Sequence, residues 1–212
     1  MADFKTHLAL GVAAVNLKRK VVLDIREKLT AADGATEAEM NRSVKVGDFV
    51  LSRTNAPLVP MCLKLVQRGI PARVRGRDVG AGLTAIVHKA KAHTLDQVQA
   101  HLTAWAAKQM ARAMPDEKKA ALVERVTDQV SAIEALIEVS ESVDDLLSKI
   151  SAMFNDSNKT PCVMLSTVHR AKGLEAERVF ILEKTFTISG AEEENIRYVA
   201  ITRAKAHLTF VA

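Results

Sequence analysis

The sequence predicts an α/β protein in which a parallel sheet, with helices on both faces, is interrupted by an all-helical insertion. Short apolar stretches bounded by polar turns lie toward both ends of the chain, whereas residues 83–156 show helical spacing throughout. Hydrophobic residues make up 48% of the chain but aromatic ones only 4%. A core of Ala, Leu, Val, Ile and Met favours close packing of helices around a small sheet.

Capping and turn residues divide the first third of the chain. Residues 3–30 are predicted to be mainly helical, as two helices or as a helix and a strand, because Arg19 interrupts the apolar stripe. Thr36 with Glu39 forms a possible capping box. Gly69 is expected to end a helix because glycine adopts the left-handed backbone of a C-cap. Around that glycine we expect a strand at Phe49–Arg53, a helix at Pro57–Gln67 and a short strand at Ala72–Arg75.

Three glycines, Gly76, Gly80 and Gly82, follow the short strand. They lack the Lys-Ser/Thr ending of a nucleotide loop, so we expect a plain turn between strand and helix. Contact with a DNA backbone is the second interpretation, because arginines flank the run at positions 73, 75 and 77. Residues 64–91 carry seven Lys or Arg and one acid, a balance that favours a polyanion as partner over an ordinary solvated face.

The helical segment has three expected helix starts. Thr94 with Gln97 caps one helix, Pro115 suits the first turn of the next, and Ser142 caps a third. Acidic residues predominate in residues 116–145, with nine acids and three bases, as is typical of a solvated helix face.

Two stretches near the C-terminus concentrate polar chemistry. Residues 163–182 indicate a buried strand, a polar turn and a second strand, and the turn contains potential phosphate and sugar ligands. These ligands are Ser166, Thr167, His169, Arg170, Lys172 and Glu175, beside Gly173, where the backbone can approach closely. Residues 192–211 indicate a helix that ends near Thr202, Arg203 and Lys205, followed by a closing strand.

Three segments together resemble the UvrD/Rep-like superfamily 1 DNA helicases. From the N-terminus they are VLSRTNAPLVPMCLKLVQRGIPARVRG (50–76), VMLSTVHRAKGLEAERVFIL (163–182) and EEENIRYVAITRAKAHLTFV (192–211). The family has its motifs in this same order. The resemblance implies a second, C-terminal RecA-like domain made of residues 1–82 and 157–212, with residues 1–47 poorly matched. Residues 83–156 are expected to form the inserted helical subdomain.

The resemblance also implies roles for individual residues. Arg203 would reach the γ-phosphate of ATP as the catalytic arginine finger, Glu175 would bind the ribose, and Gly173 would let the backbone approach the nucleotide. The expected DNA-binding residues are Arg53, Thr54, Asn55, Arg75, Arg77, Thr167 and His169. Simpler interpretations stay open, because an arginine suits the C-terminus of any helix and Asn55 suits a turn that starts one.

No phosphate loop of the form G-x-x-x-x-G-K-[ST] and no acidic metal-binding strand is found in the sequence. The implied cofactor, ATP with Mg²⁺, would therefore have its metal held by a missing N-terminal RecA-like ATPase domain, supplied in cis or in trans, and no metal site is expected here. We expect this chain to be half of a helicase motor acting on single-stranded DNA, and inactive alone. The alternatives are a free-standing DNA-binding or regulatory module derived from a helicase, and a degenerate enzyme without a ligand.

Compartment is indicated by what the sequence lacks. Cys62 and Cys162 are isolated and favour buried thiols over a disulfide. No signal peptide or membrane-spanning stretch is evident, so we expect a soluble, intracellular (cytoplasmic) protein without membrane contact.

Overall fold

The computed structural model describes residues 30–111, 117–155, 160–186 and 190–212. The chain divides into two compact units. The first unit comprises Met1–Arg53 and Val168–Ala212, and the second comprises Thr54–Thr167. Each unit is described by itself.

Within the described part of the first unit, four parallel strands follow the spatial order β1-β6-β5-β2. They are β1 (Thr30–Ala35), β2 (Phe49–Ser52), β5 (Ala176–Leu182) and β6 (Ala204–Val211). The register pairs Val50 with Phe180, and Phe180 with Thr209. Because parallel strands run in one direction, the C-terminal ends of β2 and β5 lie at one edge of the sheet. The N-terminal ends of β5 and β6 lie together at the opposite edge.

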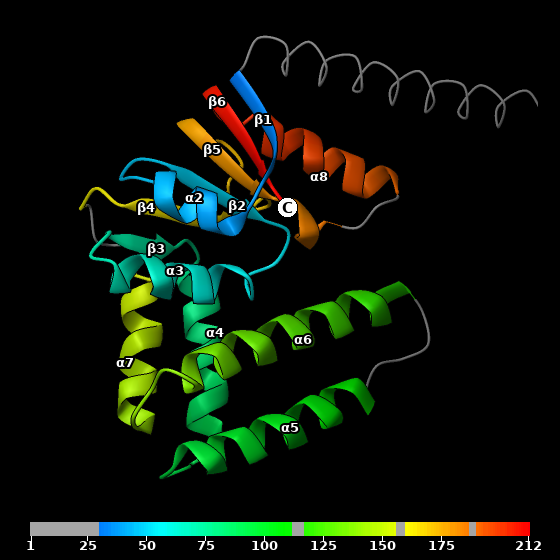
Figure 1. Ribbon diagram of the computed structural model, residues 1–212. Coiled ribbons are helices and arrows are strands. Elements are labelled where there is room, and N and C mark those ends of the chain that lie inside the picture. Colours follow the sequence, from blue (N-terminus) through cyan, green and yellow to red (C-terminus); the bar gives the residue numbers. More distant parts are fainter. Residues whose placement is uncertain (1–29, 112–116, 156–159, 187–189) are drawn as a thin grey trace, which may run out of the picture. The chain divides into compact units, whose positions relative to one another are not determined.

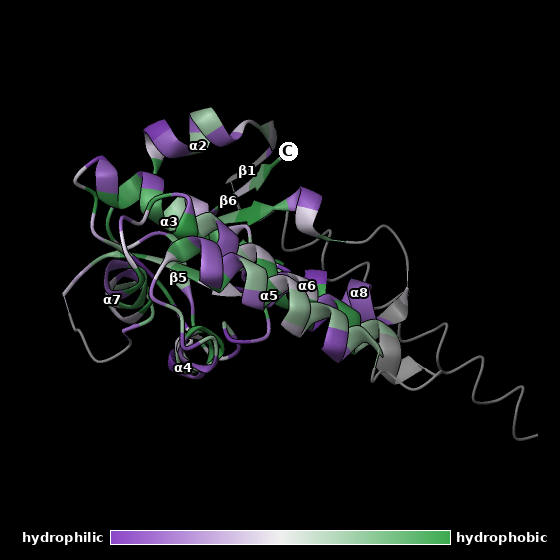
Figure 2. Ribbon diagram, turned by 90° about the horizontal axis from the view of Figure 1, so that it is seen from below, coloured by the Kyte–Doolittle hydropathy of each residue, from purple (hydrophilic) through white to green (hydrophobic). Residues whose placement is uncertain are grey.

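Both faces of β5 are buried along Val179–Leu182, as expected for an inner strand of a parallel sheet. On one face, Val179 and Ile181 pack in a hydrophobic cluster with Ile196 and Ala200 of α8 (Ala191–Ile201). On β5 the alternate residues Phe180 and Leu182 are also buried. Figures 1 and 2 show α8 and α2 (Glu37–Ser43) on opposite sides of the strands. A 3-10 turn, Glu183–Thr185, follows β5.

In its described residues, the second unit contains one parallel strand pair and five helices. The pair is β3 (Ala72–Val74) with β4 (Val163–Thr167). The helices are α3 (Leu58–Gln67), α4 (Arg77–Lys89), α5 (Leu95–Ala111), α6 (Glu117–Ile137) and α7 (Val143–Met153). α6 packs against α3, α5 and α7 (Figure 1). Because α3 packs against the strand pair, α6 connects that pair's neighbouring helix to α5 and α7.

The glycine run does not form the plain turn that the sequence predicts. Gly76 precedes α4 with a positive φ of 139°, but Gly80 and Gly82 lie inside that helix. A Cβ atom on Gly80 would lie 2.6 Å from Cβ of Phe154, which leaves no room for a side chain. The glycine is therefore required by close packing of α4 near the end of α7, and glycine composition alone does not distinguish this from a turn.

The α/β fold class with parallel strands is confirmed. Three predicted caps are also present: Thr36 with Glu39 forms a capping box, Thr94 accepts from the Gln97 N–H, and Ser142 accepts from the Asp145 N–H.

Strand β1 was not predicted. The mainly helical segment predicted at 3–30, apart from its last residue, and the predicted position of Pro115 lie outside the described residues. The boundary predicted at residue 83 falls inside α4, and the division into a RecA-like domain and an insertion stays a prediction.

Both cysteines are free thiols. Burial, with a smaller contribution from nearby Cys162, raises the pKa of Cys62 to about 12. Among the described residues, no helix is both long and apolar enough to span a membrane.

Candidate functional site

The Lys-Gly turn, which we define as residues 168–175, connects β4 to β5. Its backbone is held by short-range hydrogen bonds: the Ala171 N–H donates to the Val168 carbonyl (3.2 Å), and the Leu174 N–H donates to the Ala171 carbonyl (3.1 Å). Gly173 has a φ of +79°, and open space surrounds the position where a Cβ would lie. A left-handed glycine beside open space leaves room for another group to approach its backbone, and contact with a nucleotide there stays a prediction.

The Thr-Arg corner, which we define as residues 202–205, connects α8 to β6. At the end of α8 the Thr202 N–H makes the last ordinary helical bond, to the Tyr198 carbonyl, and the Arg203 N–H makes a shorter-range bond to the Ala200 carbonyl, at 3.1 Å each. The Thr202 hydroxyl donates to the Val199 carbonyl (2.9 Å). These bonds tighten the last turn and fix the direction in which Arg203 leaves the helix.

Backbone and side-chain bonds join this corner to the Lys-Gly turn. The Ala176 N–H donates to the Arg203 carbonyl (3.0 Å), and Nη1 of Arg203 donates to the Leu174 carbonyl (3.1 Å). Nζ of Lys205 lies 3.8 Å from Oε2 of Glu175. The structure therefore brings Gly173, Glu175 and Arg203 to one corner of the first unit, although about thirty residues separate them in sequence.

The Arg203 guanidinium is engaged by its surroundings. Besides the Leu174 carbonyl, it donates from Nε to the Val199 carbonyl (2.9 Å) and from Nη2 to the Thr202 hydroxyl (2.9 Å). A guanidinium has five N–H donors, so these three bonds leave donor capacity on the group. Glu175 differs: its carboxylate is half-exposed, at 52% of its side-chain surface, and its ion pair with Lys205 is long.

The RTNA segment, residues 53–56, follows β2 and was predicted to contact DNA. Its first residue, Arg53, belongs to the first unit and is tied there twice. The Arg53 N–H donates to the Thr185 hydroxyl (3.0 Å), and Nε donates to Oε2 of Glu193 (3.2 Å). Only 20% of the Arg53 side chain and 9% of the Glu193 side chain are exposed. Arg53 therefore anchors the first turn of α8 to the end of β2.

The rest of the RTNA segment belongs to the second unit, where Asp128 of α6 binds it. Nδ2 of Asn55 donates to one carboxylate oxygen of Asp128 (2.8 Å), and the Ala56 N–H donates to the other (2.5 Å). Thr54, between the two anchored parts, is half-buried. Two of the predicted DNA-binding residues, Arg53 and Asn55, thus have partners within the chain.

The other predicted DNA-binding residues differ in exposure. His169 in the Lys-Gly turn and Arg77 at the start of α4 are exposed, Arg75 is half-buried, and Thr167 at the end of β4 is buried. Arg73, by contrast, donates to the carbonyls of Asn155 (3.5 Å) and Thr160 (3.1 Å). It ties the connection between α7 and β4 to β3.

Sequence reasoning missed three residues that shape this site: Thr185, Glu193 and Asp128. Glu193 is the middle of three consecutive glutamates, and Asp128 is one of many acids in its helix, so the sequence alone singles out neither. Only the fold shows that Glu193 is buried and that Asp128 is half-buried. Among the described residues, no group of three or more His, Cys, Asp or Glu could hold a metal ion.

Comparison with known families agrees with the geometry. The family model described as the UvrD-like helicase C-terminal domain matches residues 47–212. The match includes the RTNA segment, the Lys-Gly turn and the Thr-Arg corner, and it leaves β1 and α2 outside. No curated protein matches the chain.

Proposed function

Because the chain belongs to the UvrD-like helicase C-terminal domain family, we propose that it supplies the C-terminal half of an ATP-dependent superfamily 1 DNA helicase. The observation that carries the proposal is the junction of the Lys-Gly turn with the Thr-Arg corner. The Ala176–Arg203 backbone bond and the Arg203–Leu174 bond hold Glu175, the exposed Gly173 and Arg203 close together. This arrangement supports one wall of an ATP cleft, in which the arginine would meet the phosphoryl charge.

Each residue at the junction has a distinct part in this wall. The half-exposed Glu175 carboxylate accepts hydrogen bonds from ribose hydroxyls, in exchange for its long ion pair with Lys205. Gly173 allows the backbone to approach the nucleotide. The Arg203 guanidinium is the arginine finger, a planar and permanently charged group suited to the charge spread over the γ-phosphoryl oxygens. To act, it exchanges at least some of its three internal acceptors for phosphate oxygens.

The metal and the remaining phosphate contacts come from elsewhere. ATP arrives with Mg²⁺, which is held by an N-terminal RecA-like ATPase domain in cis or in trans, since the chain has no phosphate loop. Single-stranded DNA is the polyanionic partner. Exposed His169 and Arg77 suit contact with its backbone, which positions a strand without reading its sequence.

Turnover and DNA binding test the proposal together. The isolated chain should show no steady ATP hydrolysis even with saturating single-stranded DNA, and should hydrolyse ATP once joined to the N-terminal domain of a UvrD-like helicase. It should bind a fluorescent single strand weakly, with an affinity that falls as salt rises, because phosphate contacts release counterions. Turnover by the isolated chain, or DNA binding that ignores salt, would contradict it.

A further inference from the structure

We infer that Asp128 is a positioning residue for the RTNA segment, and that it links helix α6 to the grip on single-stranded DNA. The inference rests on the proposed function. It concerns a residue that lies outside the three segments that resemble helicase motifs and comes from the predicted helical insertion.

The contact uses both oxygens of one carboxylate. Oδ2 accepts from the side-chain amide of Asn55 (2.8 Å) and Oδ1 from the backbone N–H of Ala56 (2.5 Å), across more than seventy residues of sequence. Hydrogen bonds to an ionised carboxylate are stronger than neutral ones, and two of them fix an orientation as well as a distance. The pair therefore fixes the Asn55 side chain and the backbone beside it at once.

Asp128 also completes the start of helix α3. The residue before that helix, Pro57, makes no side-chain capping bond, and the first turn of α3 contains no acid. The first N–H groups of a helix carry partial positive charge and favour a nearby anion. The Asp128 carboxylate lies just ahead of this turn and supplies the negative charge from another helix. This requirement explains an acid at residue 128 independently of any DNA.

The carboxylate decides which end of the Asn55 amide faces which way. Turning the amide over would point its oxygen at Oδ2, so the NH₂ group must face Asp128. Within the described part of the chain, Oδ1 of Asn55 is left buried without a hydrogen-bond partner. An acceptor in this state gains free energy from any donor that reaches it. A deoxyribose within a strand has no N–H or O–H group, so the expected partner is a base N–H, which reaches Oδ1 only when the atoms that bury it move aside.

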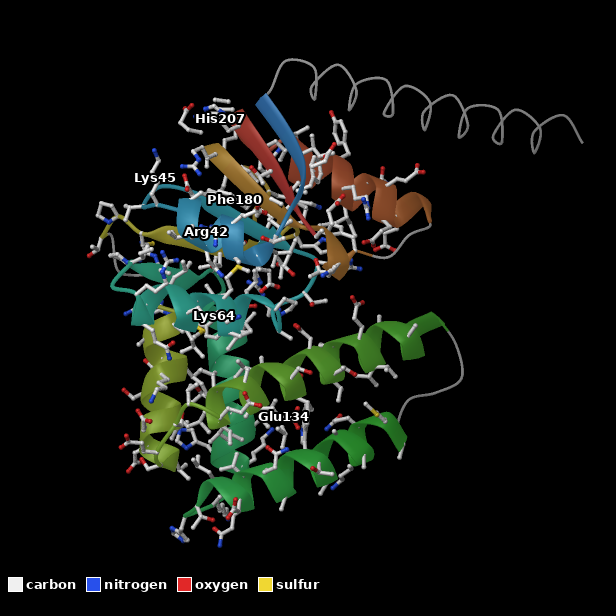
Figure 3. All side chains as sticks on the ribbon, viewed as in Figure 1. Arg42, Lys45, Lys64, Glu134, Phe180 and His207 are labelled. Atoms are coloured by element: carbon white, nitrogen blue, oxygen red, sulfur yellow. The ribbon has the colours of Figure 1, made fainter. Side chains whose placement is uncertain are left out.

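The position of α6 lets the Asp128 contact connect the neighbouring helices to the RTNA segment. α6 packs against α3, α5 and α7, so a shift of these helices reaches Asn55 and Ala56 through Asp128 (Figure 1). A matched control lies on the same helix. Glu134 accepts from Nε2 of Gln99 on α5 (2.8 Å), which is also a bond between a carboxylate and a side-chain amide (Figure 3). It has the same chemistry but no contact with the RTNA segment.

The experiment measures binding of the full chain to fluorescein-labelled oligo-dT by anisotropy, for Asp128→Ala, Asp128→Asn, Asn55→Ala, Glu134→Gln and the Asp128→Ala/Asn55→Ala double variant. Asp128→Ala should weaken binding about tenfold and Asp128→Asn less, while Glu134→Gln should stay within about twofold at a similar cost in thermal stability. In the Asn55→Ala background, Asp128→Ala should have little further effect, because a positioning residue acts through the residue that it positions. In ¹H–¹⁵N spectra, the Asn55 side-chain and Ala56 backbone signals should shift in Asp128→Asn and not in Glu134→Gln.

Two outcomes would overturn the inference while the proposed function stands. One is wild-type affinity in Asp128→Ala, or a loss in that variant that adds in full to the loss of Asn55→Ala in the double variant. The other is a loss in Glu134→Gln as large as in Asp128→Ala. If the wild-type chain binds no single strand even at low salt, the DNA part of the proposed function fails and the inference fails with it.

Discussion

The junction of the Lys-Gly turn with the Thr-Arg corner and the RTNA segment were both predicted from motif letters, yet they are built differently. At the junction, the hydrogen bonds that join the two segments end on backbone carbonyls: the Ala176 N–H donates to that of Arg203, and the Arg203 side chain to that of Leu174. The predicted ribose ligand, Glu175, stays half-exposed. In the RTNA segment, side chains provide the framework, because Arg53 and Asn55 are held by the carboxylates of Glu193 and Asp128. The same kind of polar residue is therefore available to a ligand in one region and committed to the fold in the other.

The difference follows from the free energy of each contact. An exposed ion pair contributes little to stability, so a ligand can displace Lys205 from Glu175 at small cost. A largely buried pair behaves otherwise, because removing one partner leaves a charge without compensation. We therefore expect substitutions at the junction to change function more than stability, and substitutions in the RTNA segment to change stability at least as much as function.

The largest expected effect is on turnover, at Arg203. In a helicase assembled with its N-terminal ATPase domain, Arg203→Ala should lower turnover about 10³-fold, because an arginine finger stabilises charge in the transition state. Affinity for ATP should fall much less. Arg203→Lys should not restore turnover, since an ammonium cannot reproduce the planar donor geometry. Steady-state hydrolysis and nucleotide binding measured on the same preparations separate the two effects.

Arg197→Ala is the matched control for this experiment. Arg197 lies on the same helix, α8, where it makes a long ion pair with Glu183 (3.8 Å) and contacts the Phe186 ring. It should retain wild-type turnover. If Arg203→Ala did so too, Arg203 would be no more than a cation at a helix C-terminus, and the junction would lose its catalytic role.

The next effect is on stability, at Arg53. Arg53→Ala should lower the free energy of unfolding by about 2 kcal/mol, because it leaves the buried Glu193 carboxylate without this partner. In the Arg53→Ala/Glu193→Gln double variant the loss should be smaller than the sum of the two single losses. Chemical denaturation of the isolated chain measures both quantities.

Glu183→Gln provides the exposed counterpart. Its pair with Arg197 has 40% and 39% of the two side chains exposed, so the change in stability should stay within about 0.5 kcal/mol. An Arg53→Ala protein as stable as this control, but defective in DNA binding, would restore Arg53 to the role of a DNA ligand and reverse the comparison between the two regions.

The sequence was sufficient to predict what depends on local pattern. Strands β4 and β5, the helix before β6 and the caps at Thr36, Thr94 and Ser142 follow from apolar spacing and from side chains that bond neighbouring backbone. β1 was not predicted, because TAADGA has few residues typical of a strand and owes its conformation to pairing with β6.

The partners of the site residues depend on contacts between distant segments. Arg53 and Glu193 are 140 residues apart, and Asn55 and Asp128 are 73 apart. No single-chain pattern indicates which of many acids is brought to a given arginine or amide. Gly80 shows the same limit, since its requirement for glycine is set by Phe154 across the helical region.

The smallest expected effect concerns the Glu175–Lys205 pair and gives the sharpest test of the comparison. Lys205→Ala and Glu175→Ala should each change the free energy of unfolding by no more than about 0.5 kcal/mol, because both side chains are half-exposed and 3.8 Å separates their charged atoms. Their effects on nucleotide binding should differ. In the assembled helicase, Glu175→Ala should weaken binding of an ATP analogue because the ribose loses an acceptor, whereas Lys205→Ala should leave it within about twofold, since only a replaceable partner of Glu175 is removed. A 2′,3′-dideoxyribose analogue, which lacks the hydroxyls, should bind wild type and Glu175→Ala alike. If that analogue still discriminated between them, Glu175 would act on the nucleotide by some route other than the ribose.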